Sequence, residues 1–453
     1  MPEVDLIVLD GEEETIPLSP DEHRRRLAAL RRDPSFELVA EERGSVLFGR
    51  RASPFRVTAM AALALAATPA IALDVPVSNA PELITAINAA APGHVITLAP
   101  GTYDLGQNLL CDAAGTESQP IVVRAQRLGD ALIRFDALEG FKVSAPWWRF
   151  ENLDVQGVCT DDSDCEHAFH LFGDADHTVI RHNRLHDFNA QIKSNGCCGE
   201  TFLFPDDVVV EWNELWNAAP RATSNPVTPI DVVGGRRWIV RANYIHDHQK
   251  GAGDEISYAA FLKGNSRDGL FERNLVVCEQ LHSGGVRLGL SFGGGGSGPP
   301  SICEDQTCTP EHQGGIMRNN IIRNCPADVG IYLNEAADVQ VHHNLLYANT
   351  GIDVRFAATD ADLRYNVLSG QIRNRDGGIS SETGNLEQVS ATQFANWFAN
   401  PENGDFTLLD GSAIIDLGQP LVSVPDDYCG RLRGDGAPDL GAVEHVAGAC
   451  DTT

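Results

Sequence analysis

Short apolar runs recur along the chain, and each leads to an asparagine at the same place in a repeated pattern. The pattern is apolar, any, any, polar, Asn, any, apolar, and successive asparagines are 31, 30, 30, 31, 46, 24 and 22 residues apart. A repeat of this length cannot bury a core alone, so it indicates a solenoid in which neighbouring repeats stack. The asparagines are Asn152, Asn183, Asn213, Asn243, Asn274, Asn320, Asn344 and Asn366.

The residues between these asparagines predict the fold. They form short strands rich in Val, Ile and Leu, punctuated by Gly, Asn and Asp. This predicts an all-β protein, a right-handed parallel β-helix with about three strands per coil and coils about 4.8 Å apart. Stacked asparagines would hydrogen-bond along the axis, so we interpret them as structural. The step of 46 is close to 24 plus 22, which predicts one further coil, interrupted by the glycine-rich stretch 293–298.

Both ends of such a solenoid need covers against edge-to-edge association. Residues 81–90 predict an amphipathic capping helix, and HVITLAPGTYDLG then supplies a first strand and turn. Residues 392–400 predict a second helix. The β-helix is therefore expected over 73–385 and an irregular C-terminal cap over 386–453. These opening and closing segments resemble those of bacterial right-handed parallel β-helix proteins.

A signal peptide is predicted over 46–72. Arg50, Arg51 and Arg56 precede a short apolar stretch, and Ala70-Ile71-Ala72 is an A-x-A cleavage pattern. The apolar stretch is too short to span a bilayer, so stable membrane insertion is not expected. Residues 1–45 are interpreted as an extension ahead of the true translation start. The alternative is a cytoplasmic extension ahead of a membrane anchor. Either way, the rest of the chain is expected to be secreted, periplasmic or extracellular.

The charge of the chain narrows its partners. It has 63 acidic against 34 basic residues, a formal net charge of −29. A phosphate backbone is bound by clustered Lys and Arg, so no nucleic-acid partner is expected. We expect a monomer.

The cysteines indicate disulfides rather than zinc. There are eleven, with no CxxC pair, and disulfides form in oxidising compartments. The expected pairs are Cys159 with Cys165, Cys197 with Cys198, Cys303 with Cys308, and Cys429 with Cys450. One thiol is left over, and Cys278 or Cys325 is the expected buried one.

Lys263 and Arg287 are the candidate catalytic pair. Lys263 lies eleven residues before Asn274 and Arg287 thirteen after it, so the two are predicted one coil, or about 4.8 Å, apart. A lysine with a lowered pKa can take a proton from C5 of a uronic acid, and an arginine can neutralise the carboxylate or assist the leaving oxygen. This pair predicts β-elimination.

The stretch LKGNSRDGLFERNLVVCEQLHSGGVRLG around this pair resembles the core of the chondroitinase-B and alginate-lyase family, polysaccharide lyase family 6. The resemblance implies that Lys263 is the base and Arg287 the acid. It also implies calcium, bound by acidic residues a few positions before the lysine. Ile256 and Tyr258 hold those positions here, so Asp254 and Glu255, further upstream, are the candidate ligands.

A supporting face for an acidic polysaccharide is predicted from residues at equivalent repeat positions. Arg355 precedes Asn366 by eleven residues, as Lys263 precedes Asn274. The predicted substrate-binding residues are Arg355, Tyr332, Asn334, Lys193, His170 and His312.

The sequence therefore favours a secreted polysaccharide lyase that acts on an alginate or glycosaminoglycan type of polymer. Three alternatives remain open. A C5-epimerase would use the same proton abstraction. A β-helix glycoside hydrolase would need clustered carboxylates. A non-catalytic carbohydrate-binding or surface β-helix would need no catalytic group.

Overall fold

The computed structural model describes residues 6–9, 36–42, 45–50, 73–198, 202–434 and 436–445. The chain divides into two compact units, Met1–Thr68 and Pro69–Thr453. The first unit holds a three-stranded sheet of order β1-β3-β2, with β1 (Leu6–Leu9) parallel and β2 (Phe36–Glu42) antiparallel to β3 (Ser45–Arg50). Residues 51–72 of the predicted signal peptide, which include its cleavage pattern, lie outside the described residues.

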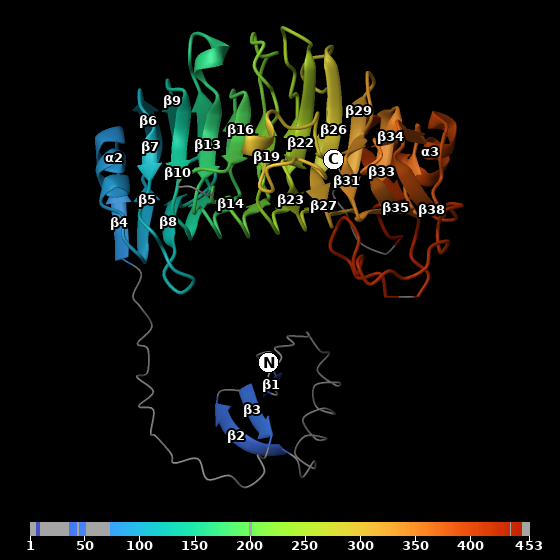
Figure 1. Cartoon of the computed structure of the whole chain (residues 1–453), viewed down its shortest axis with the longest axis horizontal. Helices are drawn as coiled ribbons and strands as arrows, with labels where there is room; N and C mark the ends of the chain where they lie inside the picture. The colour runs from blue at the N-terminus through green and yellow to red at the C-terminus, as the bar shows by residue number, and fades with distance from the viewer. Residues whose placement is uncertain are drawn as a thin grey trace. The chain divides into compact units, whose positions relative to one another are not determined.

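The second unit is a parallel β-helix built from three long sheets (Figure 1). Each full coil contributes one strand to each sheet in turn. The first sheet holds β4 (Leu73–Val77), β5 (His94–Leu98), β8 (Ile121–Ala125), β11 (Trp148–Glu151), β14 (Val179–Arg181), β17 (Val209–Glu211), β20 (Ile239–Arg241), β24 (Leu270–Glu272), β28 (Ile316–Arg318), β32 (Val339–His342), β35 (Asp360–Arg364) and β38 (Ile379–Thr383).

The other two long sheets have ten strands each. The second sheet holds β6 (Gly101–Leu105), β9 (Ala131–Phe135), β12 (Asp154–Gly157), β15 (Arg184–His186), β18 (Glu214–Trp216), β21 (Tyr244–His246), β25 (Leu275–Val277), β29 (Ile321–Cys325), β33 (Leu345–Asn349) and β36 (Val367–Leu368). The third sheet holds β7 (Leu109–Cys111), β10 (Glu139–Val143), β13 (His167–Phe172), β16 (Ala190–Asn195), β19 (Ile230–Val233), β22 (Ile256–Lys263), β26 (Val286–Phe292), β30 (Ile331–Asn334), β34 (Gly351–Arg355) and β37 (Gln371–Arg375). A short sheet of β23 (Ser266–Arg267), β27 (His312–Gln313) and β31 (Ala336–Ala337) lies between the third and first sheets along the chain.

The interior of the β-helix is a continuous apolar core. Inward side chains of successive coils stack on one another, as the rings of Phe141 and Phe169 do at 5.0 Å. The turn into the second sheet is made by a residue with a left-handed backbone, φ between 51° and 58°, immediately before each asparagine of the ladder. These residues are His182, Trp212, Ala242, Arg273, Asn319, His343 and Tyr365. The fold prediction is confirmed.

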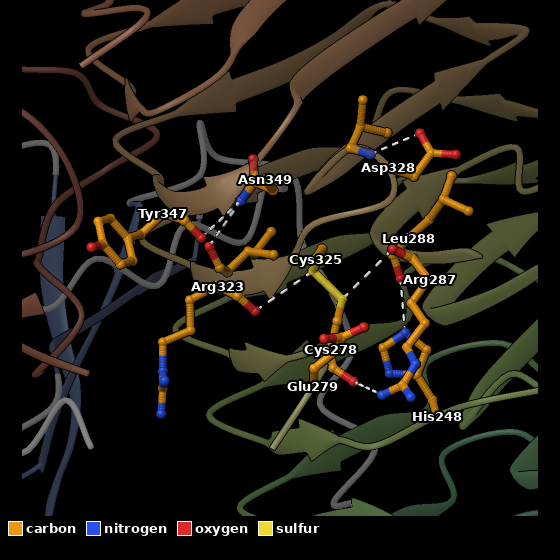
Figure 2. Close-up of a disulfide and its surroundings, with 12 residues drawn as sticks. His248, Cys278, Glu279, Arg287, Leu288, Arg323, Cys325, Asp328, Tyr347 and Asn349 are labelled. Atoms are coloured by element: carbon orange, nitrogen blue, oxygen red, sulfur yellow. Dashed lines mark hydrogen bonds between the residues drawn. A yellow bond between two sulfur atoms is a disulfide. The ribbon is translucent and has the colours of Figure 1, made fainter. Parts of the chain in front are cut away.

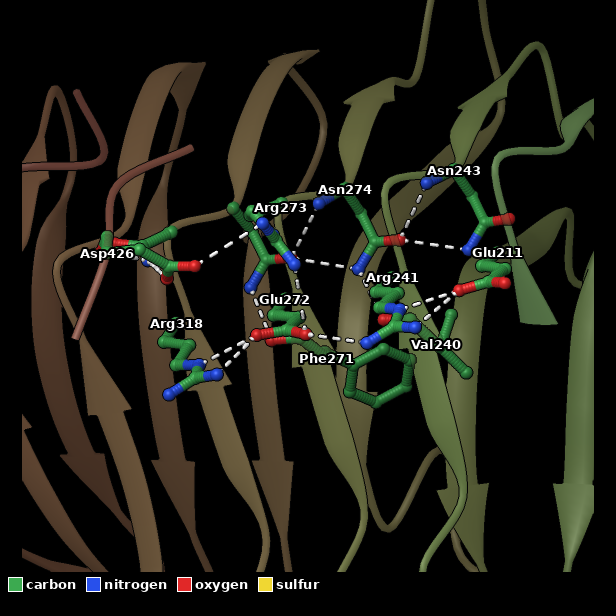
Figure 3. Close-up of polar contacts among 12 residues, drawn as sticks. Glu211, Val240, Arg241, Asn243, Phe271, Glu272, Arg273, Asn274, Arg318 and Asp426 are labelled. Atoms are coloured by element: carbon green, nitrogen blue, oxygen red, sulfur yellow. Dashed lines mark hydrogen bonds and ion pairs between the residues drawn. The ribbon is translucent and has the colours of Figure 1, made fainter. Parts of the chain in front are cut away.

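The asparagine ladder is structural, as predicted, and Figure 3 shows part of it. The side chain of Asn243 donates to Val210 O (2.9 Å) and to Asn274 Oδ1 (3.1 Å), while its own Oδ1 accepts from the backbone and side chain of Asn213. Each rung therefore satisfies a backbone carbonyl of the preceding coil and links two coils.

Three details of the ladder differ from the prediction. Asn274 bonds directly to Asn320 (2.9 Å), so the 46-residue step is one coil with an insertion and contains no hidden coil. Leu153 occupies the position expected for Asn152, because its backbone N–H donates to Asn183. The ladder also continues to Asn385, which accepts from Asn366.

The disulfides match three expected pairs and correct one expectation. Cys159–Cys165, Cys197–Cys198 and Cys303–Cys308 are bonded. Cys278 and Cys325 are not left over, because they form a disulfide between adjacent coils, shown in Figure 2. The free thiol among the described residues is the buried Cys111. Cys429 is disulfide-bonded, and its expected partner, Cys450, lies outside the described residues.

The two caps occupy the expected places. Helix α2 (Ala80–Asn88) begins at the N-cap Asn79, whose side chain accepts from Glu82 N, and it buries Leu83 and Ile87 over the first coil. Helix α3 (Ala391–Trp397) has a capping box formed by Ser390 and Gln393. It is followed by the hairpin of β39 (Phe398–Asn400) and β40 (Asp405–Leu408). Short 3-10 helices lie at Asp162–Asp164, Pro300–Ile302 and Pro401–Asn403.

Candidate active site

A row of charged side chains crosses the outward face of the third sheet. The register aligns Lys142, His170, Lys193 and Asp231 on four neighbouring strands. Lys263 ends the next strand and pairs with Val233, two residues beyond Asp231. Since neighbouring strands are about 4.8 Å apart, the parallel ladder brings together side chains that are 23 to 38 residues apart in sequence.

Glu139 bonds to the first two side chains of this row. Its carboxylate lies 2.6 Å from Lys142 Nζ and 2.5 Å from His170 Nδ1, and His170 Nε2 lies 2.8 Å from Asn195 Oδ1. Burial alone would raise the pKa of Glu139, but the two bonded cations outweigh burial and lower it to about 2. Lys193 is similarly paired, with Nζ 2.7 Å from Asp231.

Lys263 is different from the other three lysines. Lys142, Lys193 and Lys250 each form an ion pair, whereas no ion pair of Lys263 occurs within the described part of the chain. Its Nζ donates to the carbonyl of Gly296 (2.9 Å) and lies 4.6 Å from the centroid of the Phe261 ring. Burial lowers the pKa of Lys263, and the charge of Lys193 adds to this, while Asp231 and Glu311 oppose it. Lys263 is therefore the lysine best suited to act as a base.

His167 is a site residue that the sequence analysis missed. It lies on the outward face beside His170, with ring centroids 5.3 Å apart, and its Nδ1 has no hydrogen-bond partner. Burial lowers its pKa to about 4, so the imidazole is neutral near pH 7. Glu139 and Asp231 were also missed. Aligning CEHAFHLF with the following coils would have revealed this row, because a β-helix places equivalent repeat positions side by side.

The structure does not bring Lys263 and Arg287 together. Arg287 pairs with Ser257, six residues before Lys263 on the same strand, which is about 20 Å along it. Its side chain is 1% exposed and donates to Cys278 O (Figure 2). It also donates to Gly284 O (2.9 Å) and to Gln249. The prediction that both residues reach one sugar is corrected, because Arg287 braces an interior bend.

Arg355, Tyr332 and Asn334 lie on the third sheet, where Tyr332 and Asn334 are largely buried. Asn334 pairs with Arg355 in the register, and Arg355 Nη1 donates to the hydroxyl of Tyr332 (3.0 Å). Arg355 is also 2.6 Å from Asp376. The structure thus extends the polar face several coils beyond Lys263.

His312 cannot contact a polymer, which corrects its predicted role. It is fully buried, stacks on Phe292 with ring centroids 4.0 Å apart, and bonds through Nδ1 to Ser266. Burial lowers its pKa to about 3. A neutral ring in the core binds no carboxylate.

The predicted calcium ligands do not form a calcium site. Asp254 is committed to Lys250 Nζ (2.6 Å) and to the backbone N–H of Ile256 (3.0 Å). In the described ranges no group of three or more His, Cys, Asp or Glu could hold a metal ion. Calcium requires six to eight oxygen ligands, so Asp254 and Glu255 do not fit it.

The outward charges of the first sheet show the opposite arrangement (Figure 3). Acids and bases alternate from coil to coil, with Glu211–Arg241 at 2.7 Å, Arg241–Glu272 at 3.8 Å and Glu272–Arg318 at 2.5 Å. Arg241 and Glu272 therefore each have an opposite charge on both neighbouring strands. The third sheet instead places Lys142, His170 and Lys193 on successive strands, with Glu139 and Asp231 as their partners.

Comparisons with known proteins agree with this fold. No known protein family matches the chain. Pectate lyase L of Dickeya chrysanthemi is 31% identical over 121 residues, which are 23% of this chain and 28% of that protein. The chain thus matches little more than a quarter of the length of that relative.

Among solved structures, pectate lyase Pel9A has a TM-score of 0.55 at 16% identity, over 80% of this chain and 90% of that one. An alginate lyase from Paenibacillus sp. str. FPU-7 has a TM-score of 0.39 at 17% identity, over 69% and 95% of the two chains. The chain therefore has the parallel β-helix fold of polysaccharide lyases, as the resemblance implied. In the part of the chain that the structure describes, no helix is long and apolar enough to cross a membrane.

Proposed function

We propose that this protein is a polysaccharide lyase that cleaves a uronate-containing polysaccharide by β-elimination on the third sheet. One observation carries the proposal. Lys263, which has no ion pair within the described residues, has a lowered pKa and lies at the end of its strand on the third sheet, two strands from Lys193. A lysine base needs this lowered pKa, since an ordinary lysine is protonated near neutral pH.

The proposed reaction uses groups of this chain alone. The neutral amine of Lys263 takes the C5 proton of a bound uronate. The electron pair of that bond forms the C4–C5 double bond, and the bond from C4 to the glycosidic oxygen breaks. The leaving oxygen takes a proton, which the newly formed Lys263 ammonium can return on the same face. Lys193, two strands away, takes over the carboxylate-binding role first assigned to Arg287.

The charges of the molecule support an anionic substrate at this face. The chain as a whole is strongly negative, so a polyanion needs a local group of cations to approach. The basic side chains on this face are Lys142, paired with Glu139, and Lys193, paired with Asp231. Arg355 lies further along the same sheet. The names of Pel9A and pectate lyase L make polygalacturonate the first substrate to test, ahead of alginate and glycosaminoglycans.

A hydrolase is less well supported. Hydrolysis needs two carboxyl groups free to act on the glycosidic bond. On the third sheet Glu139, Asp231 and Asp353 are each held by one or two cations. Four disulfides within the described residues support a location outside the cytoplasm.

The test measures the ultraviolet absorbance of unsaturated uronate while the full chain acts on polygalacturonate, alginate and glycosaminoglycans. Lys263→Ala should lower the rate about 10²–10⁴-fold, the usual contribution of a positioned base. Because the base must be neutral, the rate should rise with pH and level off below the ordinary lysine pKa of about 10.4.

The matched control is Arg364→Ala, which removes one cation from the first sheet, and it should leave the rate unchanged. No absorbance change on any uronate polymer would contradict the proposal. Inversion at C5 without chain cleavage would instead identify an epimerase, and retained binding without either reaction would identify a carbohydrate-binding protein.

A further inference from the structure

The coil that follows Lys263 carries an insertion, residues 293–311, between β26 and β27. The disulfide Cys303–Cys308 closes part of it. Glu304 fixes it to the preceding coils, since its backbone N–H donates to Gly264 O (3.0 Å) and its carboxylate pairs with Arg236. The insertion is therefore anchored against the end of the strand that bears Lys263.

One peptide group of the insertion joins Lys263 to a buried carboxylate. Lys263 Nζ donates to the carbonyl of Gly296, and the N–H of the same peptide, on Ser297, donates to Glu311. Ser297 Oγ also donates to Glu311 (2.6 Å). Glu311 accepts a further bond from the backbone of Gly264 (2.7 Å), the residue after Lys263, and is only 2% exposed.

Glycines allow the insertion to approach this closely. A Cβ on Gly294 would lie 3.1 Å from the Phe261 ring and 3.3 Å from Lys263 Cδ, and its φ is +53°. A Cβ on Gly293 would lie 1.8 Å from the carbonyl oxygen of Asn334. The glycine-rich stretch thus lets backbone, rather than side chains, cover Lys263.

We propose that Glu311 is a positioning residue for Lys263. Its carboxylate holds both the strand end at Gly264 and the Gly296–Ser297 peptide, so the Lys263 amine has one fixed place beneath the insertion. The catalytic consequence rests on the proposed function, whereas the restraint on Lys263 does not. The charged groups near the amine are Asp231 from β19, Lys193 from β16 and Glu311 itself.

The experiment uses the full chain with Glu311→Gln. This substitution keeps the shape of the side chain but replaces one of its two acceptor oxygens with an NH2 group. The matched control is Glu304→Gln, which alters the ion pair between the same insertion and Arg236 and leaves the Gly296–Ser297 peptide untouched. The first readout is the labelling rate of each lysine by an amine-selective reagent, followed by peptide mass spectrometry. The chain has four lysines, so Lys142, Lys193 and Lys250 serve as internal references.

We expect Glu311→Gln to raise the labelling rate of Lys263 several-fold and to leave the other three lysines unchanged. If the lyase is active, its kcat should fall by about 10- to 100-fold with little change in KM, as expected when a reacting group is misplaced. Glu304→Gln should change neither quantity. If Glu311→Gln does not fold, Ser297→Ala tests the same restraint with a smaller effect in the same direction.

Unchanged Lys263 labelling in a folded Glu311→Gln protein would overturn the inference, and so would a loss of kcat without a selective change at Lys263. Absence of lyase activity in the unmodified protein would remove the proposed function alone, because the labelling result would still decide whether Glu311 restrains Lys263.

Discussion

The four lysines differ in what surrounds the ammonium group, and this difference singles out one of them. Three lie within 2.7 Å of a carboxylate, which stabilises the charged form. Lys263 Nζ instead contacts a peptide carbonyl and an aromatic ring, and within the described part of the chain no carboxylate lies at ion-pair distance from it. Burial without an ion-pair partner disfavours the charged form, so the pKa of Lys263 is lowered.

Arg287 illustrates a charged residue whose role is structural. Arg287→Ala would leave the carbonyls of Cys278 and Gly284 without this donor, and it would remove the positive charge 3.8 Å from the buried Asp247. Loss of one partner of a buried charge pair costs about 3–5 kcal/mol. We expect urea denaturation to show a decrease of this size in the free energy of unfolding, while the rate per folded molecule is kept. Normal stability with lost elimination would restore the catalytic role that the sequence predicted.

At the scale of elements, the asparagine ladder and the left-handed bends hold the coils in register. Each rung is buried and connects the turn of one coil to the next. A rung in the middle has partners on both sides, whereas Asn385 at the end has one ladder partner. The contribution of a rung therefore depends on its place in the stack.

Asn243→Ala should lower the free energy of unfolding by about 2–4 kcal/mol, since it leaves the backbone N–H of Asn213 and the carbonyl of Val210 buried without partners. Asn385→Ala should cost clearly less, because its rung is only partly buried. Chemical denaturation of both variants checks this. Equal decreases in the free energy of unfolding at the two positions would show that burial does not determine how much a rung contributes to stability.

At the scale of the whole molecule, cations of the third sheet extend along the helix axis. Arg373 and Arg375 lie on β37, four strands beyond Lys263 and therefore about 19 Å from its strand. Both share Asp353, which leaves one positive charge in excess. A long polyanion bound along the axis would reach them, whereas a disaccharide at Lys263 would not.

The Arg375 side chain is 43% exposed. Arg375→Ala should raise the KM for a long polymer by about two- to fivefold, because one exposed charge contact contributes a binding free energy of this size. It should leave kcat unchanged and have no effect on a disaccharide or trisaccharide. Steady-state kinetics over a series of chain lengths measures this, with Arg364→Ala on the first sheet as the charge-matched control. An equal effect at all lengths would show that the polymer does not lie along the axis.

The sequence by itself determined the β-helix, its caps, most of the ladder and three disulfides, because each depends on local periodicity or on short spacings. It also pointed to Lys263, Lys193 and His170, whose equivalent repeat positions share one face. The face of Arg287 could not be predicted in this way. The register of β22 with β26 is the same on both sides of Ala259, but Ala259 and Ala260 both lie in the core, so the alternation of inward and outward side chains breaks within the strand. A displacement of one residue in this alternation places every side chain beyond it on the opposite face of the strand.

Only the tertiary structure decided the environment of the site. The insertion 293–311 packs on a strand that ends thirty residues earlier, so the burial of Lys263 and the restraint by Glu311 have no local signal. The same holds for Cys278–Cys325, whose cysteines are 47 residues apart but meet because one coil is unusually long. A repeat pattern specifies which positions are equivalent. The actual lengths of the coils decide which side chains become neighbours, and those neighbours set burial, charge and chemistry.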